Sequence, residues 1–415
     1  MRLRACTFAL AAVLPLRAFA QTPPPPPAAT DVPPAAAMPP AEKPVAEPPA
    51  VPPSAPAVMA TPSVPVPPPA APAAPAPKLT WGGLVDTYYL FNFTRNGANT
   101  LLAPGIAAPM GVVLPNRVFD NSSNSFELAL AKVSLNAAMD VVSFQLDMGY
   151  GTDGTVINGG SAASGPSFLL EQAFGTITLP ANLTLDFGKF VTTAGAEVIE
   201  ANKNWLYSRS FLFGVIPFVH TGVRANLKVS DQLTLQASLV NNWGGTSTPD
   251  NNAWKTIGLS ASITASPMVS AVITAYFGKE ATQGMMASTP GDLRVLIDAV
   301  GAFTINDKFG LNLNIDYIKA YDDVAADYMI GAALMGRYVV SDHLYLAARG
   351  EFLSTHIDAA SHTTTVEEGT VMVGLPVGKN FELRPEIRAD FSGDAVYTNG
   401  KKNEFTAEAA ALTFF

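Results

Sequence analysis

The residues best suited to chemistry are five charged side chains spaced two apart near the end of the chain. Glu382, Arg384, Glu386, Arg388 and Asp390 alternate with apolar residues between Phe381 and Phe391. Side chains of an extended strand point alternately to its two sides, so all five charges would share one face. Such a row can attract ions and polar solutes, or its members can pair with one another. The other face is apolar and must meet either a protein core or lipid.

Signals for catalysis or metal binding are weak. His343 lies in an expected turn, and His356 and His362 lie in one expected loop with a spacing that fits no common metal motif. Ser208 and His220 could form a hydrolase pair, but no neighbouring residue marks a nucleophile. We therefore predict no catalytic residue, no metal site and no cofactor.

Alternation with a period of two residues recurs from Leu79 to the last residue. Runs such as 142–148, 183–187, 219–229 and 309–316 separate apolar from polar positions. Each run is about ten residues long, which is what a tilted strand needs to cross a bilayer, and none resembles a transmembrane helix. Two irregularities are expected: a bulge or misplaced boundary where the parity changes after Phe126–Leu130, and a bulge or bridging water at Pro385, which lacks an N–H.

Short and long connections between these runs alternate. Tight turns are expected near 138–140, 180–182, 230–232, 266–267, 306–308, 341–343 and 378–380, with longer polar or glycine-rich stretches between them. This alternation predicts about 16 strands, since short turns on one side and long loops on the other are typical of transmembrane barrels.

The first 78 residues of the chain have a different composition. Arg2 and Arg4 precede an apolar run, and Ala18-Phe19-Ala20 fits a cleavage site, which predicts a signal peptide over residues 1–20. Residues 21–78 are dominated by proline and alanine and should form a disordered linker in the periplasm. Cys6, the single cysteine, leaves with the signal peptide. The net charge of −9 argues against a nucleic-acid partner.

Together these patterns predict an all-β protein, a transmembrane antiparallel β-barrel over residues 79–415 preceded by the disordered segment. A barrel of about 16 strands leaves an aqueous channel. The final Phe415 resembles the C-terminal signal read by the barrel assembly machinery of outer membranes. The alternation then assigns candidate pore-lining residues, namely Asp186, His220, Arg224, Asp298, Arg349 and Glu351 together with the five charges between Phe381 and Phe391.

The middle of the chain resembles the β-barrel porin-2 (OmpL-like) family. The resemblance rests on three stretches, Gly188–Glu200, Asn204–Ser210 and Pro217–Arg224, with Glu171–Phe174 and Val240–Trp243 as further family positions. It implies a diffusion channel in the outer membrane of a Gram-negative bacterium.

Residues 191–217 would be the third outer loop, connecting the fifth and sixth expected strands. In general porins, which the layout of this chain resembles, that loop folds inward and narrows the pore. Glu197, Glu200, Lys203 and Arg209 could then face each other across the constriction and set ion preference. The alternative is a surface loop packed on the barrel rim.

The sequence therefore favours an outer-membrane porin for passive diffusion of small hydrophilic solutes and ions, without enzymatic activity. Expected partners are outer-membrane lipid and lipopolysaccharide, the assembly machinery and the solutes, with a homotrimer as a possible assembly. Two other classes stay open: a secreted or surface all-β adhesin without a pore, whose apolar face would pack on a second sheet, and an outer-membrane barrel enzyme.

Overall fold

A computed structural model describes most of the predicted barrel. It covers residues 77–95, 100–101, 105–107, 113–115, 117–160, 164–243, 250, 252–280, 293–321, 326–357, 362–397 and 400–415. The predicted signal peptide and all but the last two residues of the predicted linker lie outside the described residues.

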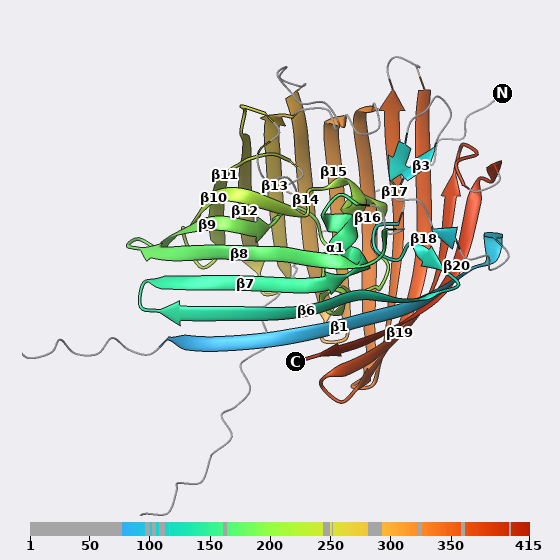
Figure 1. Cartoon of the computed structure of the whole chain (residues 1–415), viewed down its shortest axis with the longest axis horizontal. Coiled ribbons are helices and arrows are strands. Elements are labelled where there is room, and N and C mark those ends of the chain that lie inside the picture. The colour runs from blue at the N-terminus through green and yellow to red at the C-terminus, as the bar shows by residue number, and fades with distance from the viewer. Residues whose placement is uncertain are drawn as a thin grey trace, which may run out of the picture. The chain divides into compact units, whose positions relative to one another are not determined.

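Within the described residues, sixteen antiparallel strands form one closed barrel (Figure 1). Each strand pairs with its neighbours in sequence, and β1 pairs with β20 to close the ring. This confirms the predicted fold class and strand number. The barrel strands are β1 Lys78–Asn92, β6 Phe126–Met139, β7 Val142–Gly151, β8 Ser167–Leu179, β9 Leu183–Val191, β10 Val219–Lys228, β11 Leu233–Val240, β12 Thr256–Ser266, β13 Val269–Lys279, β14 Leu293–Asn306, β15 Phe309–Tyr321, β16 Ala326–Ser341, β17 Leu344–Ile357, β18 His362–Val377, β19 Phe381–Ser392 and β20 Asn403–Phe414.

Short elements lie in three of the long connections. They are η1 Phe93–Arg95, β2 Thr100–Leu101, β3 Gly105–Ala107, β4 Val113–Pro115 and β5 Ser122–Ser123 between β1 and β6, α1 Thr152–Ile157 after β7, and η4 Ala201–Lys203 and α2 Phe211–Val215 between β9 and β10. None of the helices in the described part of the chain is long and apolar enough to cross a membrane.

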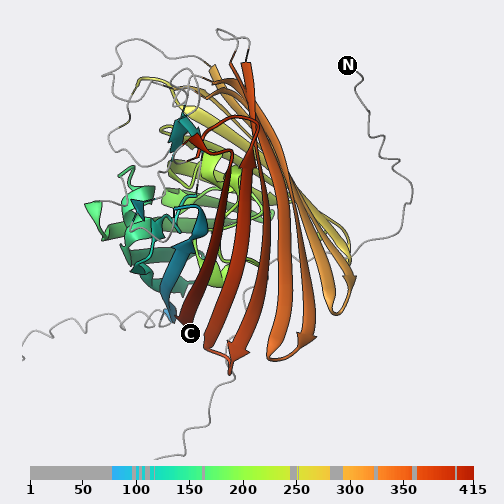
Figure 2. The ribbon, with the colours of Figure 1, turned by 90° about the vertical axis from the view of Figure 1, so that its right-hand side faces the viewer.

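The short turns fall where the sequence predicts them. Residues 180–182 connect β8 to β9, and Ala181 and Asn182 adopt φ values of 62° and 58°, the left-handed conformation that such turns require. Asp140 and Gly378 provide the same conformation at two other turns, with φ values of 45° and 67°. Figure 2 shows the short turns at the same end of the barrel as the C-terminus.

Apolar side chains face outward and charged side chains inward, the reverse of a soluble sheet protein. On β19, Ile387 is 65% exposed, whereas its neighbours Glu386 and Arg388 are 2% and 1% exposed. The same alternation runs along β17 and β18. In the described residues the apolar face meets no second sheet, so the adhesin alternative lacks the packing that it needs.

The predicted parity change in β6 is a bulge. Asp86 of β1 pairs with Leu130 and Thr87 pairs with Leu128, so Ala129 is an extra residue and both Ala129 and Leu130 are buried. A second bulge in β8 leaves Glu171 without a partner on β7. The prediction of a bulge at Pro385 is wrong, because the register between β18 and β19 does not shift from Met372↔Glu386 to Leu375↔Leu383.

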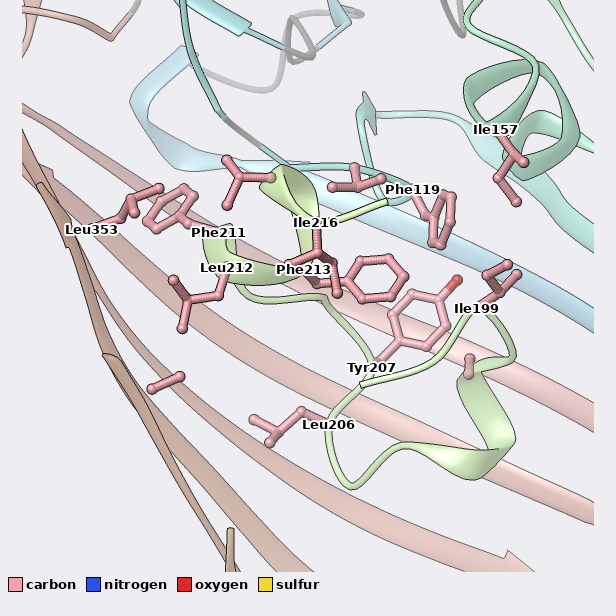
Figure 3. Packing of buried hydrophobic residues seen from close by; sticks show 14 of the residues in the cluster. Phe119, Ile157, Ile199, Leu206, Tyr207, Phe211, Leu212, Phe213, Ile216 and Leu353 are labelled. Atoms are coloured by element: carbon pink, nitrogen blue, oxygen red, sulfur yellow. The ribbon is translucent and has the colours of Figure 1, made fainter. Parts of the chain in front are cut away.

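A hydrophobic core lies inside the barrel. The connection from β9 to β10 contributes Leu206, Phe211, Leu212 and Phe213, all buried (Figure 3). The rings of Phe119 and Phe213 meet at 5.7 Å, so the connection between β1 and β6 also contributes to this core. Part of the interior is therefore filled by folded loops rather than by water.

Candidate functional site

The connection between β9 and β10, residues 192–218, folds into the barrel, and we call it the inner loop. Its atoms hydrogen-bond with inward-facing side chains around most of the circumference. The wall partners are Gln236 on β11, Tyr276 on β13, Asn314 on β15, Glu351 on β17, Glu386 on β19, Asp86 on β1 and Lys132 on β6. The inner loop is thus attached to every second strand from β11 around to β1, and also to β6, which is adjacent to β1.

Arg349 on β17 is a further attachment point, and its guanidinium donates hydrogen bonds to Glu197, Ser208 and Glu368. Its Nη1 donates to Oε1 of Glu197 at 2.9 Å and to the carbonyl oxygen of Ser208 at 2.7 Å, while its Nε donates to Oε1 of Glu368 at 2.5 Å. The side chain of Arg349 is 0% exposed, so its charge depends entirely on these partners.

Glu351, also on β17, holds the start of α2. Its carboxylate accepts from the backbone N–H groups of Phe211 at 2.8 Å and Leu212 at 2.6 Å. The side chain of Ser210 caps the same helix by accepting from the N–H of Phe213 at 3.0 Å. The first N–H groups of a helix have no partners within the helix, so the wall and the cap together satisfy them.

The charged row of β19 binds the backbone of the inner loop. Glu386 accepts from the N–H of Tyr207 at 2.8 Å, and Arg384 donates to the carbonyl oxygen of Ala201 at 2.7 Å. Arg388 donates to the carbonyl oxygen of Arg209 at 2.6 Å and pairs with Asp390 at 2.7 Å. Glu382 pairs with Arg384 at 3.0 Å. All five residues face inward as predicted; the inner loop covers Arg384, Glu386 and Arg388, whereas Asp390 lies 3.9 Å from Arg117 of the connection between β1 and β6.

The four predicted constriction residues lie at different places in the inner loop. Glu200 and Lys203 are paired at 2.7 Å. Glu197 binds Arg349 and the N–H of Ser210, whereas Arg209 donates to the carbonyl oxygens of Val198 at 3.1 Å and Ile199 at 2.5 Å. Three of the four are buried, and the Lys203 side chain is 53% exposed.

The other predicted pore-lining residues lie on the inner wall. Arg224 pairs with Asp186 at 2.8 Å. His220 is fully buried and stacks on Tyr276 with ring centroids 4.7 Å apart. Asp298 lies opposite Asp316 in the β14–β15 register, and the amide of Asn314 donates to both carboxylates.

Several charged residues of this network were not singled out by the sequence. Lys132 donates to Glu171 at 2.7 Å and to Glu200 at 2.6 Å, and Glu368 binds Arg349. The bulges at Ala129 and Glu171 shift the parity around Lys132 and Glu171. Glu367 and Glu368 are consecutive acidic residues, so their polarity alone does not indicate which of the two faces the interior. Arg117 and Asp120 pair inside the barrel from a connection in which no periodicity applies.

Glu200 is a carboxyl group of the inner loop whose pKa is lowered by neighbouring ammonium groups. Burial alone would raise its pKa, but the ammonium groups of Lys132 and Lys203 outweigh burial and lower the pKa of Glu200 to about 2. Glu171 and Asp147, which also face Lys132, compete for the same ammonium group. The carboxylate of Glu200 therefore stays charged in mildly acidic solution.

We expect the attachment of residues 196–210 to weaken in acid. A carboxyl whose folded-state pKa lies below its ordinary value of 4.5 stabilises the fold above that value, and this contribution is lost as the pH falls toward about 2. Hydrogen exchange of this segment, corrected for the intrinsic rate, should accelerate between pH 5 and pH 2.5. The variant Glu200→Gln should show faster exchange throughout and a flatter pH profile; equal profiles would contradict the assignment.

Among the described residues, no group of three or more His, Cys, Asp or Glu side chains could hold a metal ion. The arrangement is instead a membrane barrel with an apolar outer wall, a polar interior and a loop bonded across that interior. Such an arrangement defines the class of outer-membrane channels.

The comparison with protein families agrees with this class. The family described as "Putative beta-barrel porin-2, OmpL-like" matches residues 78–415, and the chain belongs to it. The protein is therefore an outer-membrane porin, a channel for small solutes.

Solved structures of outer-membrane proteins share the fold. An anion-selective porin from Comamonas acidovorans has a TM-score of 0.54 and 12% identity, and the match covers 82% of this chain and 100% of that chain. The outer-membrane expressed OmpT of Vibrio cholerae has a TM-score of 0.53 and 13% identity, covering 82% of this chain and 99% of that chain. The channel DcaP of Acinetobacter baumannii has a TM-score of 0.53 and 12% identity, covering 82% and 98%. No curated protein matches the sequence.

Proposed function

We propose that the inner loop is the constriction of a passive diffusion channel for small hydrophilic solutes. The observation that carries this proposal is the attachment of the inner loop to inward-facing side chains from β11 around to β6. A loop fixed at so many points reduces the cross-section of the barrel permanently, and solutes must pass beside it.

The channel itself has a direct test. Full-length protein extracted in detergent should migrate faster on a gel before heating than after, and it should produce discrete current steps in a planar bilayer. Absence of both the heat shift and the current would refute a channel.

Ion preference should depend on Lys203 more than on the buried charges of the inner loop. Its side chain is 53% exposed and reaches the water of the channel. Changing the charge by two units with Lys203→Glu should raise the cation permeability and lower the anion permeability, each by roughly threefold per unit of charge at an effective separation of about 6 Å in water. The cation-to-anion permeability ratio should therefore rise by roughly tenfold per unit of charge. Reversal potentials in a potassium chloride gradient measure this ratio.

Lys228→Glu is the matched control, because Lys228 has a similar side-chain exposure of 56% and lies at the end of β10 beside a short turn. Its reversal potential should stay close to that of the unmodified protein. Equal shifts in the two variants would show that Lys203 does not lie at the narrow part of the channel.

The proposal includes the surroundings of the barrel. We place the linker of residues 21–78 in the periplasm of a Gram-negative bacterium and lipopolysaccharide around the outer rim. Phe415 is 63% exposed, and its ring packs edge-on against Trp81 at 4.9 Å, which leaves it accessible to the assembly machinery.

One structure of OmpT of Vibrio cholerae is described as a trimer form. We propose a homotrimer here as well, and chemical cross-linking in outer-membrane vesicles tests it.

A further inference from the structure

Uncharged amide side chains cover one part of the inner wall. On β6, β7 and β8, Nδ2 of Asn136 donates to Oε1 of Gln145 at 3.1 Å. Gln145 and Gln172 in turn donate to the two oxygens of Asp147, at 2.7 Å and 2.6 Å. Asp147 is 3% exposed, while the three amides are partly exposed. Gln172 also accepts from the N–H of Val191 at 3.1 Å, so the amides cover the carboxylate, hydrogen-bond along the wall and stay partly exposed.

A second group of amides continues across β9, β10 and β11. Nδ2 of Asn226 donates to Oδ2 of Asp186 at 3.1 Å, and Nε2 of Gln236 donates to Oδ1 of Asn226 at 2.8 Å. Arg224 neutralises Asp186, which is 4% exposed. Here too the charged groups pair with each other, and the two amides are partly exposed, whereas the paired Arg224 side chain is 13% exposed.

An aromatic ring lies between the two groups. Phe174 points inward from β8, where its neighbours in register are Gln145 on β7 and Gly188 on β9. Gly188 has no side chain, and the guanidinium of Arg224 lies 5.6 Å from the centroid of the Phe174 ring, which stays partly exposed. A Cβ at Gly188 would lie 2.9 Å from Cα of Phe174, and its φ of 135° also favours glycine.

The opposite wall, on β17 and β19, exposes far less polar side-chain surface to solutes. Arg349, Glu386 and Arg388 are at most 3% exposed because the inner loop covers them. A solute passing beside the inner loop therefore meets amides and an aromatic ring on β6–β11 more than it meets free charges.

We propose that the amide track, defined as Asn136, Gln145, Gln172, Asn226 and Gln236, together with Phe174 is a contact site for neutral polyhydroxylated solutes such as sugars. Amide groups both donate and accept, so they match hydroxyl groups, which do the same. The apolar face of a sugar ring can lie on an aromatic ring while its hydroxyls reach the flanking amides. This inference names the solute class and rests on the proposed channel function.

The test is the ionic current of the full-length protein in a planar bilayer while glucose is added. A contact site makes the current fall and then level off as the site fills, whereas an empty channel shows only a decrease proportional to the glucose added. We expect saturation for the unmodified protein. In Gln145→Leu the half-saturating concentration should rise about fivefold, the effect of one hydrogen bond.

Two further variants guard against misfolding and non-specific effects. Asn136→Leu removes the member of the track on β6, next to a short turn, and should raise the half-saturating concentration by about twofold to fivefold. Asn312→Leu is the matched control, since Asn312 is a partly exposed inward amide on β15, and it should leave the value unchanged. Heat-modifiable migration confirms that each variant is folded.

The outcomes separate the two proposals. A protein without any current refutes the channel and the contact site with it. A current that decreases only in proportion to glucose, or that saturates identically in all variants, overturns the contact site and leaves the channel intact.

Discussion

Replacing Arg349 by methionine should release the inner loop and widen the channel. The change leaves Glu197 buried without its cation and Glu368 with only Arg388 at 3.8 Å, and breaking a buried ion pair in this way costs about 3–5 kcal/mol. It also removes the donors to Ser208, so the segment around Glu197 and Ser208 loses its attachment to β17. The barrel wall, whose strands are paired independently of the inner loop, should remain closed.

Release of the inner loop can be measured by single-channel conductance. The conductance of Arg349→Met should be higher than that of the unmodified protein, and its current should be noisier. Arg337→Met is the matched control. The Arg337 guanidinium lies 4.1 Å over the ring of Tyr345, and among the described residues it forms no hydrogen bond or ion pair with the inner loop. If both variants conduct as the unmodified protein does, Arg349 does not hold the constriction.

Replacing Ile387 by arginine should impair insertion of the barrel, because this side chain faces lipid near the middle of β19. An arginine on the lipid-facing side costs about 2–4 kcal/mol at the bilayer midplane and about 0–1 kcal/mol near the interfaces. Val377→Arg is the depth control, since Val377 is 58% exposed and lies at the end of β18 beside the short turn.

Folding into lipid vesicles, titrated with denaturant, gives the free energy of unfolding for both variants. Ile387→Arg should lose about 2–4 kcal/mol and Val377→Arg at most about 1 kcal/mol. An equal loss of unfolding free energy in both variants would mean that Ile387 does not lie near the bilayer midplane.

The strands could be predicted from the sequence because their pattern is local. Alternation along residues 381–391 correctly separates the buried Arg388 from the exposed Ile387, since each side chain meets only one of two solvents. The turns are equally local, and Asp140, Asn182 and Gly378 adopt the conformations that tight turns favour. Closure of the barrel then follows from the strand number and the alternating loop lengths.

The interior could not be predicted in the same way. Inward orientation was correct for Glu386 and Arg384, but orientation does not reveal what covers a side chain. Their partners are backbone groups of Tyr207 and Ala201, 179 and 183 positions away in sequence, and no periodicity encodes such contacts. Whether solutes touch the inward-facing charges stays a prediction, and the burial of most of them favours a role in holding the inner loop.

The pairing of β1 with β20 sets the order of folding events. The hydroxyl of Thr87 donates to the carbonyl oxygen of Ala411 across 324 residues of chain, and the backbone of Phe415 exchanges two hydrogen bonds with Gly83. Contacts this distant in sequence form slowly, whereas every other pair of barrel strands is adjacent in order along the chain. Until the last strand arrives, β1 and β19 each present an open edge that could capture another chain. Pairing of β20 with β1 is therefore the slow step that closes the barrel. An assembly intermediate that lacks only β20 should be the species most prone to aggregation.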